Sequence, residues 1–316
     1  MNNKTIELLE EAISRRRDLR CHTNALRLVN GYGDGLAGLI IEQYDRHFVL
    51  QISDKRWFTE KDILTSFIRD RLQGIYLVVK DRTASVSATP DAIKVSVWIN
   101  HSTSKTIVQE NGLRFEVDLN DGLNSGLFLD MRHNRKIVAQ MAMNRRVLNC
   151  FSYTCSFGVY CRAAGAKGLV NVDISRKSLE RGKLSYELNQ LIPAYNEFIR
   201  NDTLSYLARA IKKKNCFDLI ILDPPSFSRH ENKTFSVKKD LKALVKSATE
   251  ILSPGGALFL STNFSELSCD DLEGEVRDAS GIRRIKDIQH LGQDEDFIVN
   301  GFSLESYLAA VLVEMC

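Results

Sequence analysis

The pattern of hydrophobic and polar positions divides the chain into two parts of different character. Residues 4–18 place apolar side chains at helical spacing and end in arginines, so we predict an N-terminal helical segment over 1–22. The stretches that follow alternate apolar and polar residues on either side of one amphipathic helix at 60–72. This order predicts a small α+β domain over 23–104, with two strands, a helix and two more strands.

From residue 105 onward the pattern changes to a regular alternation of strands and helices. The dipeptide Asn111-Gly112, between alternating apolar residues, first predicts a hairpin. The predicted strands lie at 145–151, 169–174, 197–202, 217–223 and 257–262, with helices near 157–165, 176–190, 203–214 and 238–252 and closing strands at 282–291 and 303–314. Such alternation is typical of an α/β fold, so we predict a Rossmann-like sheet with helices on both faces over 105–316.

The composition is that of a globular protein and excludes few functions. The 316 residues are 44% hydrophobic and 26% charged, and the net charge of +3 is too mild to demand a nucleic-acid partner. The seven cysteines form no Cys-x-x-Cys pair and the six histidines show no ligand spacing beside them, so we predict no metal site. Because the charged N-terminus lacks a signal-peptide core and no apolar run could span a bilayer, we expect a cytoplasmic protein without membrane association.

One glycine motif, Gly33-Asp34-Gly35-Leu36-Ala37-Gly38, matches the dinucleotide-binding fingerprint G-x-G-x-x-G. That fingerprint needs a helix to begin at the glycines, so that its amide groups meet a pyrophosphate. Residues 39–52 are instead apolar and alternating, with Asp45-Arg46 in their middle, and predict a hairpin. We interpret the motif as a turn between strands. A nicotinamide-dependent oxidoreductase remains an alternative with this single support.

Acidic or amide residues follow four successive strands of the predicted sheet. These residues are Asn149, Asp173, Asp202 and Asp223. Because the carboxyl ends of parallel strands meet at one edge of the sheet, we expect the four side chains to surround a ligand crevice. Asp173 is a candidate to accept the hydroxyl protons of a nucleoside ribose, and Asp202 a candidate for an adenine amino group. The alternative for each aspartate is that it caps the helix that follows.

The turn Asp223-Pro224-Pro225-Ser226-Phe227 carries a sharper signal. Two prolines directly after an apolar strand stop the strand and fix an extended backbone. Because prolines lack N–H donors, the turn presents carbonyls and a carboxylate, and Phe227 could stack on a planar base. These features predict a binding pocket for a base, whereas the alternative is a rigid connection to the next helix.

These motifs carry a family resemblance. Residues 146–227 resemble class I S-adenosylmethionine-dependent methyltransferases. Residues 24–262 resemble, more narrowly, the family that contains the bacterial 23S ribosomal RNA large-subunit base methyltransferases, with guanine nitrogen-7 and cytosine-5 branches. The resemblance is carried by NGYGDGLAGLIIEQY, GLNSGLFLDMRHNR, VLNCFSYTCSFGVYCRAAGA, VNVDIS and DPPSFS. It implies S-adenosylmethionine as the cofactor and RNA as the partner, either 23S ribosomal RNA or a large-subunit precursor.

The resemblance also implies roles for individual residues. Across the cofactor cleft it places Phe128, Asp130, Arg132 and Arg135, with an arginine for the methionine carboxylate, and under the methionine it places Asn149, Phe151, Ser152, Tyr153 and Thr154. It implies that Asp173, Ile174 and Ser175 bind the ribose, and that Asn201, Asp202 and Thr203 bind the adenine. It implies that the target base is bound by Asp223, Pro224, Pro225 and Phe227, and that Asp223 also lies beside the cofactor. The alternatives are core packing for the aromatic residues and a helix surface for the arginines. One departure is that Cys155 and Ser156 stand where the family often has glycines.

The atom that receives the methyl group depends on whether a thiol is available. Methylation of cytosine carbon-5 needs a thiolate to add to the neighbouring carbon. The two positions where such enzymes carry the cysteine are here Pro225 or Ser226 and the stretch 261–264, and neither holds one. Cys269 is close by in the sequence, but we expect it to lie in a helix that begins near Ser268. Ser261-Thr262-Asn263-Phe264 resembles the guanine nitrogen-7 branch, so we favour guanine nitrogen methylation.

Other readings stay open at this point. They are a cytosine-5 enzyme with an unrecognised nucleophile, a methyltransferase for a small molecule or a protein, and a non-catalytic RNA-binding protein. The oligomeric state is open too, with a homodimer as one option. We expect Asp223→Ala to remove activity while cofactor binding remains measurable.

Overall fold

The computed structural model of the chain forms two compact units, which are described one at a time. The first comprises residues 1–130 and 294–303, and the second comprises residues 131–293 and 304–316. The structure describes residues 3–83, 93–121, 124–230, 233–281, 284–299 and 308–316.

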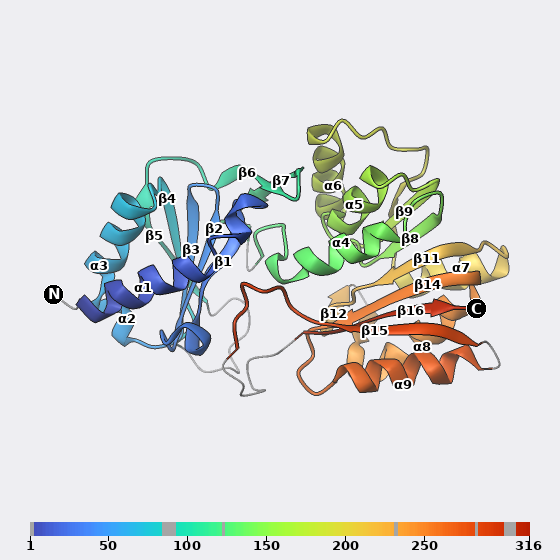
Figure 1. Cartoon of the computed structure of the whole chain (residues 1–316). Helices are drawn as coiled ribbons and strands as arrows, with labels where there is room; N and C mark the ends of the chain where they lie inside the picture. Colours follow the sequence, from blue (N-terminus) through green and yellow to red (C-terminus); the bar gives the residue numbers. More distant parts are fainter. Residues whose placement is uncertain (1–2, 84–92, 122–123, 231–232, 282–283, 300–307) are drawn as a thin grey trace. The chain divides into compact units, whose positions relative to one another are not determined.

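The first unit is built on a five-stranded sheet of order β1-β2-β3-β4-β5 (Figure 1). Its strands are β1 (Ala25–Asn30), β2 (Leu39–Tyr44), β3 (His47–Ile52), β4 (Tyr76–Asp81) and β5 (Lys94–Asn100), and its helical segments are α1 (Asn3–Arg15), η1 (Leu19–Cys21), η2 (Gly31–Asp34), α2 (Arg56–Thr59), α3 (Lys61–Ser66) and the π-type turn η3 (Phe67–Arg71). β3 and β4 are parallel because the helical segment crosses between them, and the other pairs are antiparallel. Leu9 of α1 packs with Leu26, Leu28 and Phe48 of the sheet in one apolar core. The predicted helix at 60–72 is therefore present in pieces, and three strands rather than two precede it.

The hairpin at Asn111-Gly112 belongs to the first unit. Its strands are β6 (Lys105–Glu110) and β7 (Leu113–Asp118), and both turn residues have left-handed backbones, with φ of 49° and 82°. This is the conformation that an Asn-Gly hairpin turn requires, so the predicted hairpin is present. A bridge between Thr23 and Glu110 ties it to the first sheet. The division of the chain thus falls at residue 130 rather than at the predicted boundary of 105, because this contact is not visible in the alternation pattern.

The second unit confirms the predicted α/β fold. Its sheet has the order β10-β9-β8-β11-β14-β16-β15, and β16 runs antiparallel to both of its neighbours while the first five strands are parallel. The strands are β8 (Arg146–Cys150), β9 (Gly168–Asp173), β10 (Phe198–Arg200), β11 (Phe217–Leu222), β14 (Leu252–Thr262), β15 (Ile285–Leu291) and β16 (Ala309–Met315). The predicted closing strands begin in residues 282–283 and 303–307, which lie outside the described residues.

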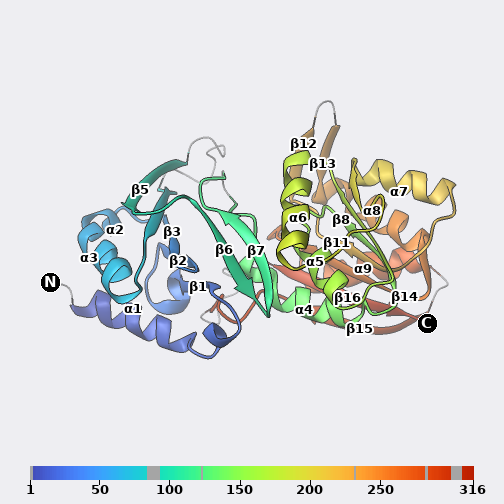
Figure 2. The same cartoon turned by 90° about the horizontal axis from the view of Figure 1, so that it is seen from above.

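Helices cover both faces of this sheet (Figures 1 and 2). They are α4 (Arg132–Gln140), α5 (Ser156–Ala163), α6 (Arg176–Leu188), α7 (Thr203–Lys212), α8 (Val237–Glu250) and α9 (Cys269–Ser280), with η5 (Leu129–Met131) leading into α4. One apolar cluster joins α4 and α5 to the sheet, and a second joins α7, α8 and α9 to it. The hairpin of β12 (Phe227–His230) and β13 (Lys233–Ser236), which follows the proline turn, was not predicted, and α4 corresponds to the helix offered only as an alternative for Arg132 and Arg135.

A short segment after β15 returns to the first unit before the chain continues into β16. The Oδ2 atom of Asp296 accepts a hydrogen bond from the amide of Arg27 at 2.6 Å, and the Asp296 carbonyl accepts one from Arg16 at 2.7 Å. The Nδ2 atom of Asn30 donates to the carbonyl of Ile298 at 2.9 Å. Residues 294–298 are therefore held on the first sheet by buried polar contacts.

The glycine motif lies beneath this segment and has a structural use. Residues 31–34 form a single short 3₁₀ turn, and 39–44 form a strand, so no α-helix begins at the glycines. The buried Asp34 carboxylate accepts two hydrogen bonds from Arg16, both at 2.7 Å. The motif is thus a turn between strands, as predicted, and the structural requirement of a nicotinamide site is not met.

Replacement of Gly33 by alanine is expected to destabilise the first unit. A Cβ atom at Gly33 would lie 1.9 Å from the carbonyl oxygen of Ile298, a distance at which the backbone must move. We expect a loss of about 3 kcal/mol in the free energy of unfolding, measured by urea denaturation, with faster hydrogen exchange of the Arg27 amide. Gly274→Ala is the control, since nothing lies within 4 Å of a Cβ atom at Gly274 and its φ is not positive. Equal exchange of the Arg27 amide in both variants would contradict the assignment.

Candidate active site

The carboxyl ends of four neighbouring strands bring together the residues predicted from the sequence. Asn149 lies near the end of β8 and pairs in register with Asn171 of β9 and Ile221 of β11. Asp173 is the last residue of β9, and Asp223 follows β11 directly. Asp202 stands two residues beyond β10, the edge strand of the sheet. The predicted convergence at one edge of the parallel sheet is therefore what the fold produces.

The loop after β8 has an unusual backbone. Phe151, Tyr153 and Cys155 have φ of 53°, 48° and 61°, so alternate residues adopt the left-handed conformation without being glycine. This conformation costs an ordinary residue about 1–2 kcal/mol, and it persists only where the surroundings impose it. Cys155 thus takes the left-handed backbone shape that glycine favours, and the loop forms without a glycine at residues 151–156.

Asp173 holds this loop against the sheet. One carboxylate oxygen accepts a hydrogen bond from the amide of Tyr153 at 2.8 Å, and the other accepts one from the amide of Ser175 at 2.8 Å. Burial raises the pKa of the Asp173 carboxyl, and the hydrogen bonds from the two amides partly offset that rise. The Asp173 carboxylate therefore holds the loop in place, and the proposed ribose contact would be a second role of the same carboxylate.

Asp202 is the N-cap of α7. Its Oδ1 atom accepts hydrogen bonds from the amide of Ser205 at 2.9 Å and from the Ser205 hydroxyl at 2.6 Å. The capping alternative stated for this residue is thus realised, and an adenine contact remains a proposal. Asn201 also lies at this corner, where its amide donates to the Asp173 carbonyl at 3.0 Å.

The proline turn is connected to the end of the fifth parallel strand. Asp223 Oδ1 accepts a hydrogen bond from the Ser261 hydroxyl at 2.7 Å, and the Ser226 hydroxyl donates to Asn263 Oδ1 at 2.5 Å. Pro224 is buried, whereas the side chain of Phe227 is 57% exposed at the start of β12. The sequence draws attention to residues 261–264 because they lack a cysteine, but it does not identify Ser261 as the partner of Asp223. No spacing rule predicts that pair.

The arginines assigned to the cofactor cleft lie in the first turn of α4. Arg132 and Arg135 are 3% and 0% exposed, so the alternative of a helix surface is wrong. The Arg135 guanidinium lies 5.9 Å from the centre of the Tyr160 ring on α5. Phe128 and Asp130 precede these residues and fall in the first compact unit.

Neither the three buried cysteines nor Cys269 is suited to act as a nucleophile. Cys150 and Cys155 are buried, and burial raises the pKa of both thiols. Burial also raises the pKa of Cys161 to about 12. Cys269 begins α9, as expected, and its sulfur lies 3.4 Å and 3.5 Å from the carbonyl oxygens of Leu291 and Ala310. The Cys269 thiol is thus directed at the backbone of β15 and β16.

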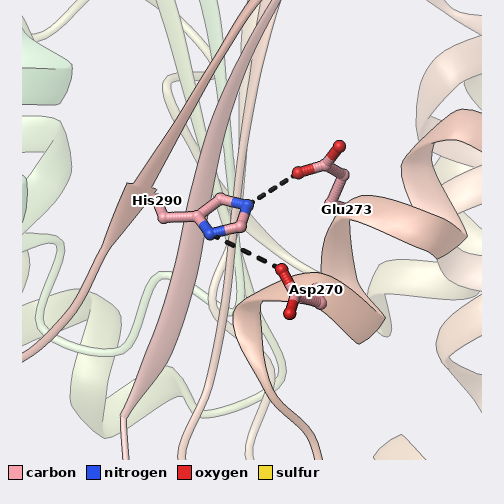
Figure 3. Close-up of side chains that lie close together, drawn as sticks. All are labelled: Asp270, Glu273 and His290. Carbon is pink, nitrogen blue, oxygen red and sulfur yellow. Dashed lines mark hydrogen bonds and ion pairs between the residues drawn. The ribbon is translucent and has the colours of Figure 1, made fainter.

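One histidine and two carboxylates come close together on the surface of the second unit (Figure 3). His290 Nε2 lies 2.7 Å from Glu273 Oε2, whereas Nδ1 lies 3.9 Å from Asp270 Oδ1. A metal ion takes one ring nitrogen, but these carboxylates approach different nitrogens. Arg277 also donates to Glu273 Oε1 at 2.7 Å. The group is therefore an ion-pair cluster between α9 and β15, and we assign no metal to it.

Comparison with known proteins decides the family. A family model described as S-adenosylmethionine-dependent methyltransferase matches residues 38–297, which is most of the chain. This chain belongs to the S-adenosylmethionine-dependent methyltransferases. Within the described residues, no helix combines the length and apolarity that crossing a membrane would require.

Relatives of this methyltransferase share most of its length. It is 35% identical over 299 residues to a Bacillus subtilis protein whose name describes a candidate ribosomal RNA large subunit methyltransferase, YwbD, with 92% of this chain and 75% of the relative covered. It is 37% identical over 260 residues to the ribosomal RNA large subunit methyltransferase K of Neisseria meningitidis, with 80% and 72% covered. A crystal structure of a methyltransferase candidate complexed with S-adenosylhomocysteine (SAH) superposes with a TM-score of 0.87, at 28% identity over 99% of this chain and 81% of that one.

The cofactor of this methyltransferase is S-adenosylmethionine, and the residues at the carboxyl edge of the sheet fit it chemically. The ribose offers two hydroxyl donors and the methionine an ammonium, and these require acceptors such as Asp173 and Asn149. The loop at 151–155 has left-handed backbone at residues 151, 153 and 155, the conformation that glycine adopts most readily. When bound, the cofactor supplies an electrophilic methyl group on a sulfonium.

Proposed function

We propose that this methyltransferase transfers its methyl group to a base of RNA, specifically to nitrogen-7 of a guanine in large-subunit ribosomal RNA. The observation that carries the proposal is the Asp223-Pro224-Pro225 turn, anchored by Ser261, with no cysteine in residues 223–227 or 261–264. The names of the relatives support ribosomal RNA as the substrate class. A cytoplasmic location follows if the substrate is the ribosome or its precursor.

The proposed acceptor suits the chemistry of the turn. Nitrogen-7 of guanine carries a lone pair and no proton, so the transfer needs neither a covalent intermediate nor a general base. The methylated purine gains positive charge, which the fixed Asp223 carboxylate would stabilise. Pro224 and Pro225 add rigidity without N–H donors that would compete for the lone pair. Phe227, which is 57% exposed, is the aromatic residue proposed to stack on the base.

Mass spectrometry of ribosomal nucleosides tests this proposal. Cells that lack the protein should lose one 7-methylguanosine per large-subunit RNA, and the wild-type gene should restore it. A gene encoding Asp223→Ala is the matched control and should not restore the nucleoside. Loss of 5-methylcytidine instead would favour the cytosine-5 alternative, and an unchanged nucleoside profile would argue for a substrate other than ribosomal RNA.

A further inference from the structure

A chain of buried hydrogen bonds runs from the proposed cofactor edge to an ion pair inside the second unit. Asn149 Nδ2 donates to Asn171 Oδ1 at 2.9 Å, and Asn171 Nδ2 donates to the Tyr186 oxygen at 3.3 Å. The Tyr186 hydroxyl donates to Glu197 Oε1 at 2.7 Å. Glu197 is in turn paired with Arg162. The first four side chains are at most 1% exposed, so water does not substitute for these contacts.

The ion pair gives this chain of contacts a direction. The Glu197 carboxylate can only accept, and it also accepts from the Ala194 amide at 2.7 Å and from Arg162 Nε at 3.2 Å. Tyr186 must therefore donate to it. Burial, reinforced by the adjacent Glu197, raises the pKa of Tyr186, which keeps the proton on its hydroxyl.

The same donor–acceptor order fixes the amide orientation of both asparagines. Because the Tyr186 proton points to Glu197, its oxygen accepts, and the NH₂ group of Asn171 must face it. The Asn171 carbonyl oxygen then faces β8 and accepts from the NH₂ group of Asn149. The carbonyl oxygen of Asn149 therefore lies at the opposite edge of its planar amide group and does not take part in the bond to Asn171. An amide that could otherwise flip is thereby held in one orientation.

Close packing keeps the two asparagines in place. A Cβ atom at Gly158 of α5 would lie 2.2 Å from Asn171 Oδ1, so only glycine lets that helix pass over the amide. A Cβ atom at Gly182 of α6 would likewise lie 2.6 Å from the sulfur of Cys155 in the left-handed loop. We call the hydrogen-bonded side chains from Asn149 to Glu197 the relay. Two helices thus pack the relay and the left-handed loop against the same strand ends.

We infer that Tyr186 and Glu197 are positioning residues that hold the Asn149 carbonyl oxygen as an acceptor for the methionine ammonium group of S-adenosylmethionine. The inference rests on the placement of the cofactor at this edge of the sheet. An ammonium group has donors only, so it requires the orientation that the relay enforces. The adenosine part of the cofactor makes no use of this acceptor, and this difference allows a test.

Calorimetric titration of the full chain with two ligands separates positioning from general damage. SAH carries the ammonium group, whereas 5′-methylthioadenosine lacks the amino-acid part. Tyr186→Phe removes the hydroxyl and keeps the ring that packs edge-on at 5.0 Å against Phe198. We expect about tenfold weaker binding of SAH and methylthioadenosine affinity within about twofold of wild type. Tyr206→Phe, another mostly buried tyrosine of the second unit, is the matched control and should change neither.

A double-mutant cycle that combines Tyr186→Phe with Asn149→Ala gives a second measurement. Tyr186→Phe should have no further effect on SAH binding once Asn149 is alanine. Equal weakening of both ligands by Tyr186→Phe, or full additivity with Asn149→Ala, would overturn the relay and leave the cofactor site intact. If the wild-type chain binds neither ligand, the site assignment fails, and the relay inference fails with it.

Discussion

Replacement of Asp223 by alanine is expected to lower kcat for RNA methylation by about 10²–10³-fold. The carboxylate is held by Ser261 at the end of a neighbouring strand, so it is fixed before substrate arrives. Preorganised charge of this kind stabilises the positive charge that develops on the base, and a water molecule in its place would have to reorient. Single-turnover assays with radiolabelled S-adenosylmethionine and ribosomal RNA measure the change.

Two controls accompany the Asp223 variant. The dissociation constant for SAH should stay within about threefold of wild type, because the proposed role concerns the base. Ser261→Ala keeps the carboxylate but removes its anchor, and we expect an intermediate loss of about tenfold in kcat. If Asp223→Ala keeps more than a tenth of wild-type kcat, the proline turn is not the base pocket.

Replacement of Asp173 by alanine is expected to weaken SAH binding by about 10²-fold or more. The change removes the proposed acceptor for two ribose hydroxyls, and it also releases the amide of Tyr153 that the carboxylate now holds at 2.8 Å. Calorimetry measures the loss directly. Because burial raises the pKa of Asp173, affinity in the wild-type chain should begin to fall at a higher pH than for an ordinary carboxyl, as protonation removes the acceptor.

Asp218 supplies the matched control for this prediction. Its carboxylate also accepts a hydrogen bond from a backbone amide, that of Arg146 at 2.9 Å, but Asp218 lies at the amino end of β11. Asp218→Ala should leave SAH affinity unchanged. If Asp173→Ala binds SAH as tightly as wild type, Asp173 is not part of the cofactor site.

The sequence predicted the second unit well because its signals are local. Each strand of the parallel sheet is an apolar run followed by a polar residue, and each crossover helix has its own period, so Asn149, Asp173 and Asp223 could be assigned to strand ends before the structure was known. The Asn111-Gly112 hairpin was equally clear, because the turn type needs those residues.

Contacts between distant positions were not predictable in this way. The Ser261 partner of Asp223 and the Glu197 end of the buried relay depend on which strands and helices become neighbours. Gly33 matched a cofactor fingerprint but serves close packing against Ile298, which comes from a segment far along the chain. Cys155 looked like a defect in a glycine loop, yet it takes the left-handed backbone itself.

A crystal structure of the chain with SAH tests where the cofactor binds. We expect the ribose hydroxyls within hydrogen-bonding distance of the Asp173 carboxylate and the amino-acid part above the loop at 151–154. We also expect the sulfur to face the turn at 223–225. Density for SAH anywhere else, such as beside the glycine turn at 33–38, would show that the cofactor site is assigned wrongly.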